Sequence, residues 1–243
     1  MVREPRLRWP VSHDLAQCIT GQKITEVNRR AKYLLFVTDA GRMMLHLGMS
    51  GSLRVLPARV DPGKHDHVDI VFTDGSLLRF RDPRRFGSVF WLKDDRHVLL
   101  DSLGPEPLSD SFDGSRLFGR SRKRKVAIKP FIMNSKEVVG VGNIYANEAL
   151  FRAGIRPGVA AGRLTRAACD RLAVCIKEVL GEAIEAGGTT LRDFVNESGN
   201  PGYFRHNLEV YGRGGEPCLK CDGELKETRL GQRTTVYCPV CQR

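Results

Sequence analysis

Short apolar runs separated by turn signals fill the first part of the chain. Runs at 32–37, 43–47 and 87–92 predict three β-strands. Apolar and polar residues alternate across 67–81 around Asp74–Gly75, which predicts a β-hairpin. Regularly spaced short strands of this kind indicate a β-sandwich or barrel.

A boundary follows at 102–115, where Pro, Ser and Asp are concentrated, and beyond it the apolar period becomes helical. We expect a long helix to begin at the N-cap Thr165 and to end at Gly187–Gly188. We also expect buried thiols at Cys18, Cys169 and Cys175. The predicted apolar face of the long helix consists of Ala168, Leu172, Cys175, Ile176, Val179 and Ala183.

A glycine-rich turn leads into a shorter predicted helix in the middle of the chain. Gly140 and Gly142 precede Asn143, which we expect to be the helix N-cap, and Gly154 provides a left-handed stop. Backbone amides at such a helix N-terminus form a typical anion site, and phosphate is the usual anion. A tight helical corner without a ligand explains the stretch equally well. The predicted apolar stripe is Ala146, Ala149, Leu150 and Ala153.

The charge balance favours a polyanionic partner. Lys and Arg total 39 against 28 acidic residues, which leaves a net charge of +11. Nucleic acid is the commonest partner of so basic a chain, although a basic protein without such a partner has the same composition. The sequence has neither the roughly 18-residue apolar run of a membrane span nor a signal-peptide pattern.

Four of the seven cysteines form two CxxC pairs, Cys218/Cys221 and Cys238/Cys241. This spacing predicts one tetrahedral zinc ion with four cysteine ligands, and the full protein ligation makes the metal structural. A redox dithiol needs only one CxxC pair, so we favour zinc. Residues 231–237 between the pairs predict a hairpin that carries Arg233 outward, where it can contact phosphate.

The order of motifs along the chain resembles bacterial formamidopyrimidine-DNA glycosylases, the family that also includes endonuclease VIII, from about Arg6 to Arg243. The resemblance implies an α+β protein of two domains, an N-terminal β-sandwich and a C-terminal helix-two-turns-helix domain with a four-cysteine zinc finger. We expect the sandwich at 1–108, the helices at 109–206 and the finger at 207–243. The motifs that carry the resemblance are RRAKYLLF, HLGMSGSLR, KHDHVDIV, DPRRFG, LGPEPLSD, AIKPFIMN, GVGNIYANEALFRAGI, GGTTLRDF, NPGYF and VYGRGGEPC.

The resemblance also implies a function and residue roles. The family repairs DNA by base excision: it removes oxidised purines, such as 8-oxoguanine and formamidopyrimidines, and cuts the abasic strand by β,δ-elimination. Lys32 matches a lysine that assists catalysis, and Arg233 matches the arginine that grips phosphate and serves the second elimination. The loop at 189–203 matches the family's lesion-reading loop. The residues that match the intercalating trio are Met49, Arg85 and Phe86. The residues that match DNA-binding positions are His65, Arg85, Arg124, Lys129 and Asn143.

The beginning of the chain departs from the family pattern. The family starts Met-Pro-Glu-Leu-Pro, and the amine of its first proline attacks the damaged nucleotide, whereas this chain starts Met1-Val2-Arg3-Glu4-Pro5. We therefore expect the 243 residues to lack the family's nucleophile and its partner glutamate, to have little or no glycosylase activity, and to be part of a longer natural protein with a further helix and strand.

The sequence is also compatible with two classes of protein that are not enzymes. One is a DNA-binding or lesion-sensing protein without catalysis, and the other is a zinc-ribbon RNA-binding or scaffold protein. The expected partner is double-stranded DNA with oxidised or abasic sites, with no membrane. We expect a monomer with one structural zinc ion, located in the bacterial cytoplasm and associated with the nucleoid.

Overall fold

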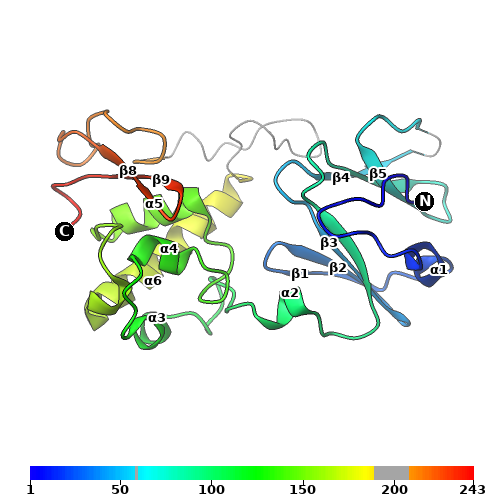
Figure 1. Ribbon diagram of the computed structural model, residues 1–243, viewed down its shortest axis with the longest axis horizontal. Coiled ribbons are helices and arrows are strands. Elements are labelled where there is room, and N and C mark those ends of the chain that lie inside the picture. Colours follow the sequence, from blue (N-terminus) through cyan, green and yellow to red (C-terminus); the bar gives the residue numbers. More distant parts are fainter. Residues whose placement is uncertain (58–59, 189–207) are drawn as a thin grey trace. The chain divides into compact units, whose positions relative to one another are not determined.

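The computed structural model describes residues 1–57, 60–188 and 208–243. They divide into two compact units, residues 1–101 and residues 102–188 with 208–243 (Figure 1). Each unit has a hydrophobic core of its own. The predicted lesion-reading loop at 189–203 lies outside the described residues.

The first unit contains two antiparallel sheets and two short helices. The larger sheet has the strand order β1-β2-β3-β7, and the smaller has the order β4-β6-β5. The elements are α1 (Leu15–Ile19), β1 (Glu26–Arg30), β2 (Tyr33–Thr38), β3 (Gly41–His46), β4 (Ser52–Leu56), β5 (Asp66–Val71), β6 (Leu77–Arg81), β7 (Ser88–Leu92) and α2 (Val98–Asp101).

Side chains from both sheets form one buried core in the first unit. Met43, Leu45 and Val89 come from the larger sheet, and Val68 and Phe80 come from the smaller, all of them buried in the same cluster. Two sheets that share an apolar layer make a sandwich. The predicted β-sandwich is therefore confirmed.

The apolar runs located the buried strands but not the exposed ones. The runs at 32–37, 43–47 and 87–92 correspond to β2, β3 and β7, and the predicted hairpin is the β5–β6 pair. The sequence analysis missed β1 and β4, along with α1. Strand β1 (EVNRR) is almost entirely exposed, so its sequence does not alternate between apolar and polar residues.

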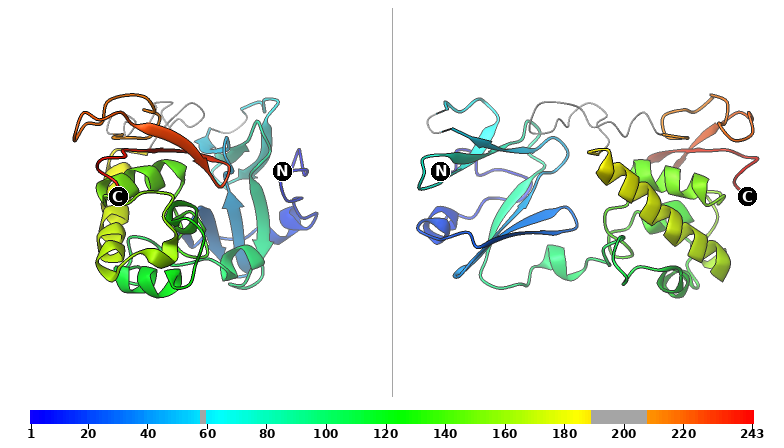
Figure 2. Two further views of the ribbon diagram at one scale, coloured as in Figure 1. Left: turned by 60° about the vertical axis from the view of Figure 1, so that its left-hand side comes forward. Right: turned by 180° about the vertical axis from the view of Figure 1, so that it is seen from behind.

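The second unit is a group of helices with a two-stranded hairpin. Figure 2 shows the longest helix, α6, with α5 beside it, and α3 also packs on α6. No helix in the described ranges is long and apolar enough to cross a membrane. The elements are α3 (Gly114–Ser121), α4 (Ile128–Ile132), α5 (Asn143–Arg152), the 3-10 helix η1 (Ala161–Arg163), α6 (Arg166–Glu185), β8 (Lys226–Leu230) and β9 (Arg233–Tyr237).

The ends of α5 and α6 largely follow the sequence signals. Thr165 caps α6 by accepting a hydrogen bond from the Ala168 N–H, as predicted. Gly154 follows α5 with a φ of 69°, which confirms the left-handed stop. The N-cap prediction for α5 was wrong by one residue: Gly142 is the N-cap and Asn143 is the first helical residue, without a side-chain cap.

The apolar stripes of both helices form the core of the second unit. Ala146, Ala149, Leu150 and Ala153 of the shorter stripe are all buried, as predicted. Of the three expected buried thiols, the structure confirms Cys169 alone. Cys18 and Cys175 are half-buried, and Cys175 packs at the margin of the core of the second unit. The predicted face residues Leu172, Ile176, Val179 and Ala183 are buried, and Ala168 and Cys175 pack against them at the edge.

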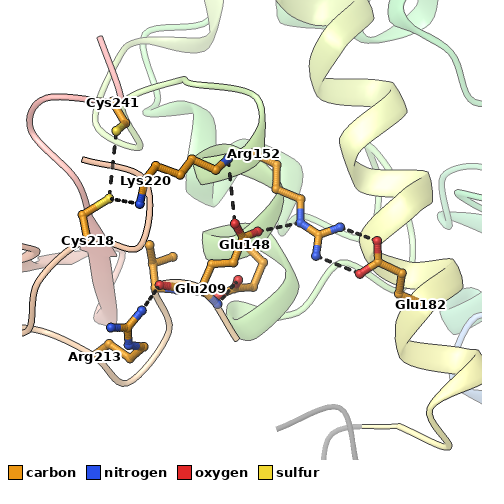
Figure 3. Close-up of polar contacts among 9 residues, drawn as sticks. Glu148, Arg152, Glu182, Glu209, Arg213, Cys218, Lys220 and Cys241 are labelled. Atoms are coloured by element: carbon orange, nitrogen blue, oxygen red, sulfur yellow. Dashed lines mark hydrogen bonds and ion pairs between the residues drawn. The ribbon is translucent and has the colours of Figure 1, made fainter. Parts of the chain in front are cut away.

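Polar contacts join α5 to the chain that precedes the β8–β9 hairpin (Figure 3). The Glu148 carboxylate accepts hydrogen bonds from the backbone N–H groups of Glu209, Val210 and Tyr211, at 2.8 to 3.1 Å. The Arg152 guanidinium donates to both Glu209 and Glu182. These contacts fix the segment at 209–211 against α5.

Candidate nucleic-acid interface

Two apolar side chains of the predicted intercalating trio are exposed on neighbouring loops of the first unit. Met49 lies in the loop at 47–51 with 62% of its surface exposed, and Phe86 lies in the loop at 82–87 with 43% exposed. Large apolar side chains that belong to a core are not exposed to this extent. Their exposure leaves both free to contact another molecule.

The structure distinguishes the two adjacent arginines of the second loop. The Arg84 guanidinium lies over the Phe86 ring, 5.6 Å from its centroid. Arg85 has a φ of 56° and forms an ion pair with Glu4 at 3.3 Å. Arg84, which the sequence analysis did not single out, is thus the arginine that accompanies Phe86, and the predicted Arg85 faces the N-terminal segment.

Lys32 is exposed in the turn between β1 and β2, next to Tyr33. Tyr33 pairs with His46 across β2 and β3, and their rings are 4.9 Å apart. The His46 Nδ1 accepts a hydrogen bond from the Gly48 N–H at 2.9 Å, beside Met49. Burial, followed by the nearby positive charge of Lys32, lowers the pKa of His46. With Nδ1 as an acceptor, a neutral His46 carries its proton on Nε2, which is then a hydrogen-bond donor.

His46 was also missed by the sequence analysis, although it begins the HLGMSG motif. The predicted DNA contact His65 lies close to the loop at 82–87: it is half-buried, and its backbone oxygen accepts the Asp82 N–H at 3.0 Å. The first unit therefore brings the predicted Met49, Phe86 and His65 near a common pair of loops.

In the second unit, the N-terminus of α5 has the features of an anion site. Gly142 is its N-cap without a side-chain hydrogen bond, so the first backbone N–H groups of the helix are not capped in that way. The Asn143 Oδ1 is buried and has no hydrogen-bond partner. Because buried polar groups normally have partners, the Asn143 amide is suited to contact a ligand.

The buried Asn147 connects this helix end to the hairpin. Its Nδ2 donates to the Asn143 backbone oxygen at 2.7 Å, and its Oδ1 accepts the Val236 N–H at 2.9 Å. The helix residue predicted to contact phosphate is therefore linked through one side chain to β9. Arg233, which is exposed at the first position of β9, follows the turn Gly231–Gln232 as the sequence predicts.

The structure corrects the predicted role of Lys129. Lys129 was expected to contact the DNA backbone, but it is fully buried in α4. Its Nζ donates to the Thr234 oxygen at 2.7 Å and to the Thr235 Oγ1 at 2.8 Å. Burial, followed by the charge of Arg233, lowers the pKa of Lys129 to about 8. The ammonium thus supports the strand that carries Arg233.

Arg124 lies in a basic turn that follows α3. Its side chain is exposed, while its backbone oxygen accepts the Gly162 N–H at 2.9 Å. The neighbouring Arg122 is held over the Phe118 ring at 3.9 Å and donates to the Leu164 oxygen. An anchored turn with an exposed guanidinium is compatible with the predicted phosphate contact.

The four cysteines of the two CxxC pairs come together as predicted. The sulfur atoms of Cys218, Cys221, Cys238 and Cys241 all lie within 4.8 Å of one another. The backbone N–H groups of Lys220 and Cys241 point at the sulfurs of Cys218 and Cys238, both at 3.4 Å. Four thiol ligands at this spacing fit one tetrahedral zinc ion.

The thiol pKa values show why this group needs a cation. Burial, reinforced by hydrogen bonds with the other thiols, raises the pKa of Cys241 to about 12. Burial also opposes the ionisation of Cys238, but the backbone N–H groups of Cys241 and Val240 lower its pKa to about 7. Four thiolates cannot be ionised together so close to one another without a positive charge between them, which zinc supplies.

These features define a class of protein: a β-sandwich joined to helices and a structural zinc finger, with basic and apolar groups suited to nucleic acid. Comparison with known protein families identifies the family within this class. The formamidopyrimidine-DNA glycosylase N-terminal domain matches residues 1–89, and the H2TH domain of the same glycosylases matches residues 103–195. A zinc finger found in FPG and IleRS matches residues 215–243. The chain belongs to the formamidopyrimidine-DNA glycosylase family.

Individual relatives agree with this assignment. The chain is 59% identical over 245 residues to the formamidopyrimidine-DNA glycosylase of Thioalkalivibrio sulfidiphilus and 58% identical over 243 residues to that of Alcanivorax borkumensis. Each match covers 100% of this chain and 90% of the relative.

Two solved structures share the fold over the whole chain. MutM (Fpg) from Thermus thermophilus is 37% identical with a TM-score of 0.87, and the match covers 89% of that protein. Lactococcus lactis Fpg, in complex with DNA that contains an abasic site, is 33% identical with a TM-score of 0.90, and 90% of it is covered.

Proposed function

We propose that this protein is a base-excision DNA repair enzyme, a DNA glycosylase that removes oxidised purines and cleaves the resulting abasic strand. The observation that carries the proposal is the exposed pair Met49 and Phe86, with Arg84 over the phenyl ring. An apolar wedge beside a guanidinium is the surface that replaces an extruded base, since base extrusion costs a few kcal/mol of stacking. Family membership supports the same activity, and it disfavours the alternative of DNA binding without catalysis.

The contacts with DNA divide between the units. In the first unit, Met49, Phe86 and an arginine of the DPRRFG motif fill the gap in the duplex, and His65 contacts the backbone. In the second unit, Arg124, Asn143 and Arg233 bind phosphates, because they combine exposed guanidinium groups with a helix N-terminus. The Lactococcus lactis relative was solved with abasic DNA, which supports double-stranded DNA as the partner.

Two residues are proposed to take part in strand cleavage. The exposed Lys32 assists elimination near the lesion, and Arg233 serves the second elimination while it holds phosphate. An amine of the protein must also condense with the C1′ aldehyde of the abasic site, releasing water and forming an imine. We take Lys32 as the candidate amine, because its side chain is exposed in the turn between β1 and β2.

The proposed division is a sandwich at 1–108, helices at 109–206 and a finger at 207–243. The three matched family regions, at 1–89, 103–195 and 215–243, support it. The zinc ion, held by the four cysteines, has a structural role, because it leaves no open coordination position. We further propose that the protein acts as a monomer in the bacterial cytoplasm, at the nucleoid.

Borohydride trapping on duplex DNA with one abasic site tests the enzymatic proposal. Borohydride reduces the imine to a stable amine, so a covalent adduct reports the reacting protein group. If Lys32 supplies the amine, Lys32→Ala abolishes the adduct, while Lys23→Ala, at another exposed lysine of the first unit, does not. If the 243-residue chain prefers abasic duplex but gives no adduct, Lys32 is not the nucleophile. A chain that neither reacts nor prefers abasic over intact duplex contradicts the proposed function.

A further inference from the structure

Asp82 is a buried carboxylate between the two loops that carry the wedge. It is fully buried, at 0% exposure, and begins the loop at 82–87. Its Oδ1 accepts a hydrogen bond from the Ser50 Oγ at 2.6 Å, and its Oδ2 accepts the Gly87 N–H at 2.7 Å. One carboxylate therefore binds the loop of Met49 and the loop of Phe86 at the same time.

The two loops also touch backbone to backbone. Gly48 has a φ of 71°, and a Cβ atom there would lie 2.6 Å from the Phe86 carbonyl carbon and 2.7 Å from the Gly87 nitrogen. A side chain at this position is excluded both by the conformation and by the contact. The Arg84 N–H reaches the Ser50 Oγ at 3.3 Å, which adds a second polar link between the loops.

Hydrogen bonds also hold the backbone of Asp82 in place. Its carbonyl oxygen is 2.7 Å from the His67 Nε2 and accepts the Arg85 N–H at 3.2 Å. Its own N–H donates to the His65 oxygen at 3.0 Å. The carboxylate is thus held from the sheet side, and its two oxygen atoms face the loops.

We infer that Asp82 is a positioning residue that holds Met49 and Phe86 in one fixed arrangement, so that both enter the base stack together. The inference rests on the proposed function, because it concerns the wedge of that reaction. Loops that are ordered before binding do not lose further conformational freedom when DNA binds, which strengthens binding to the distorted duplex. Asp82 itself is buried and touches no DNA, so its effect is transmitted through Ser50 and Gly87.

The test compares variants that cut the link with matched variants elsewhere in the same sheet. Ser50→Ala removes one hydrogen bond to Asp82 together with the acceptor of the Arg84 N–H, and Asp82→Ala removes both hydrogen bonds of the carboxylate. Ser76→Ala and Asp74→Ala are the controls, because Ser76 donates to Asp74 at 2.7 Å in the turn between β5 and β6. Asp82→Asn is the conservative variant, since its amide can still accept the Gly87 N–H and donate to the Ser50 hydroxyl.

The readout is the ratio of affinities for abasic and intact duplex, with 2-aminopurine beside the abasic site to report wedge insertion. We expect Ser50→Ala to lower the ratio about tenfold, the loss of one hydrogen bond to a charged group, and Asp82→Ala to lower it further. Asp82→Asn should retain more of the affinity ratio and of the fluorescence change than Asp82→Ala does. The control variants should retain both.

The outcomes separate this inference from the proposed function. If the Ser50 and Asp82 variants melt at lower temperature but keep the abasic preference and the fluorescence change, Asp82 has only a structural role and the inference is wrong. If the unsubstituted chain itself shows no abasic preference, the proposed function fails and the inference fails with it. A lowered ratio in folded variants, with partial recovery in Asp82→Asn, supports the inference.

Discussion

The side chains expected to contact DNA are held in position by different kinds of contact in the two units. In the first unit, Met49 and Phe86 lie on loops that are joined by short contacts around Asp82, next to the sandwich core but outside it. In the second unit, Arg233 begins a strand that is held by Lys129 and Asn147, from helices about a hundred residues earlier.

This difference predicts how the two regions respond to substitution. The side chains of the wedge, Met49 and Phe86, are themselves exposed, so truncating them should alter DNA binding with little effect on folding. The hairpin depends on buried polar contacts and a metal, and the unpaired groups left by a substitution there would be costly. In the second unit, stability and DNA binding should therefore fall together.

The largest effect is expected from Cys238→Ser, because structural zinc contributes much of the folding free energy of such a finger. The variant should bind far less than the expected equivalent of zinc, and its DNA affinity should fall roughly tenfold or more through the loss of the Arg233 phosphate contact. Metal analysis and titration with duplex DNA measure both. Cys18→Ser, outside the metal group, is the control, and full zinc retention by Cys238→Ser would contradict the four-cysteine site.

Lys129→Met should destabilise the second unit by about 2 kcal/mol, because Thr234 and Thr235 lose their buried hydrogen-bond donor. Chemical denaturation followed by a probe on the finger measures the loss. DNA affinity should fall with it, since the strand of Arg233 loses its support. A Lys129→Met protein of unchanged stability but weaker DNA binding would instead favour a direct DNA contact by Lys129.

Lys129 also predicts a pH dependence. Its pKa is about 8 in the folded protein and 10.5 for a free side chain, so between these values the unfolded chain binds more protons. Stability from this group therefore rises as the pH increases from about 8 to 10.5, and it does not change with pH below that window. The difference in unfolding free energy between the wild type and Lys129→Met, measured across that window, should grow with pH.

Glu148→Gln should lower the free energy of unfolding by a smaller amount, about 1 kcal/mol. The carboxylate accepts three backbone N–H groups of the segment at 209–211 with two oxygen atoms, whereas an amide has only one acceptor oxygen. Hydrogen exchange of those three amides should accelerate in the variant. Unchanged exchange would show that the backbone of the segment is held without Glu148.

Met49→Ala should separate binding from folding. The side chain is mostly exposed, so the free energy of unfolding should change by less than about 0.5 kcal/mol. The preference for abasic over intact duplex should nevertheless decrease, because less apolar surface fills the gap. Thermal unfolding and competitive titration measure the two quantities, and a large loss of stability would indicate that Met49 is part of the core after all.

The smallest effect is expected for Asp170→Asn on the exposed face of α6. Asp170 and Arg166 form an ion pair at 3.6 Å with both side chains more than half exposed. Such pairs contribute between zero and about 1 kcal/mol, and solvent screens them. A change above that range in thermal unfolding would show that surface charges, as well as the buried contacts, stabilise the second unit.

The sequence predicted the features that have local signals. The buried strands, the cap at Thr165, the stop at Gly154 and the four cysteines were all found, because each leaves a pattern within a few residues. Strand β1 was missed, since an exposed edge strand has no apolar period.

The site was harder to predict, because side-chain direction is not a local property. Arg84 and Arg85 are neighbours of the same type, and only the contact of the Arg84 guanidinium with the Phe86 ring shows which of them accompanies Phe86. The burial of Lys129 depends on Thr235, which is 106 positions further along the chain. No short-range pattern indicates such a pairing.

The long-range contacts of the helices have a consequence for synthesis on the ribosome. Lys129, Asn147 and Glu148 are buried polar groups whose partners lie between 209 and 236, so those partners are translated later. Until then the polar atoms that these later partners satisfy bond to water instead, and the helices expose the surface that the hairpin covers. The nascent second unit should therefore be open to proteases and chaperones until the finger has emerged and bound its zinc.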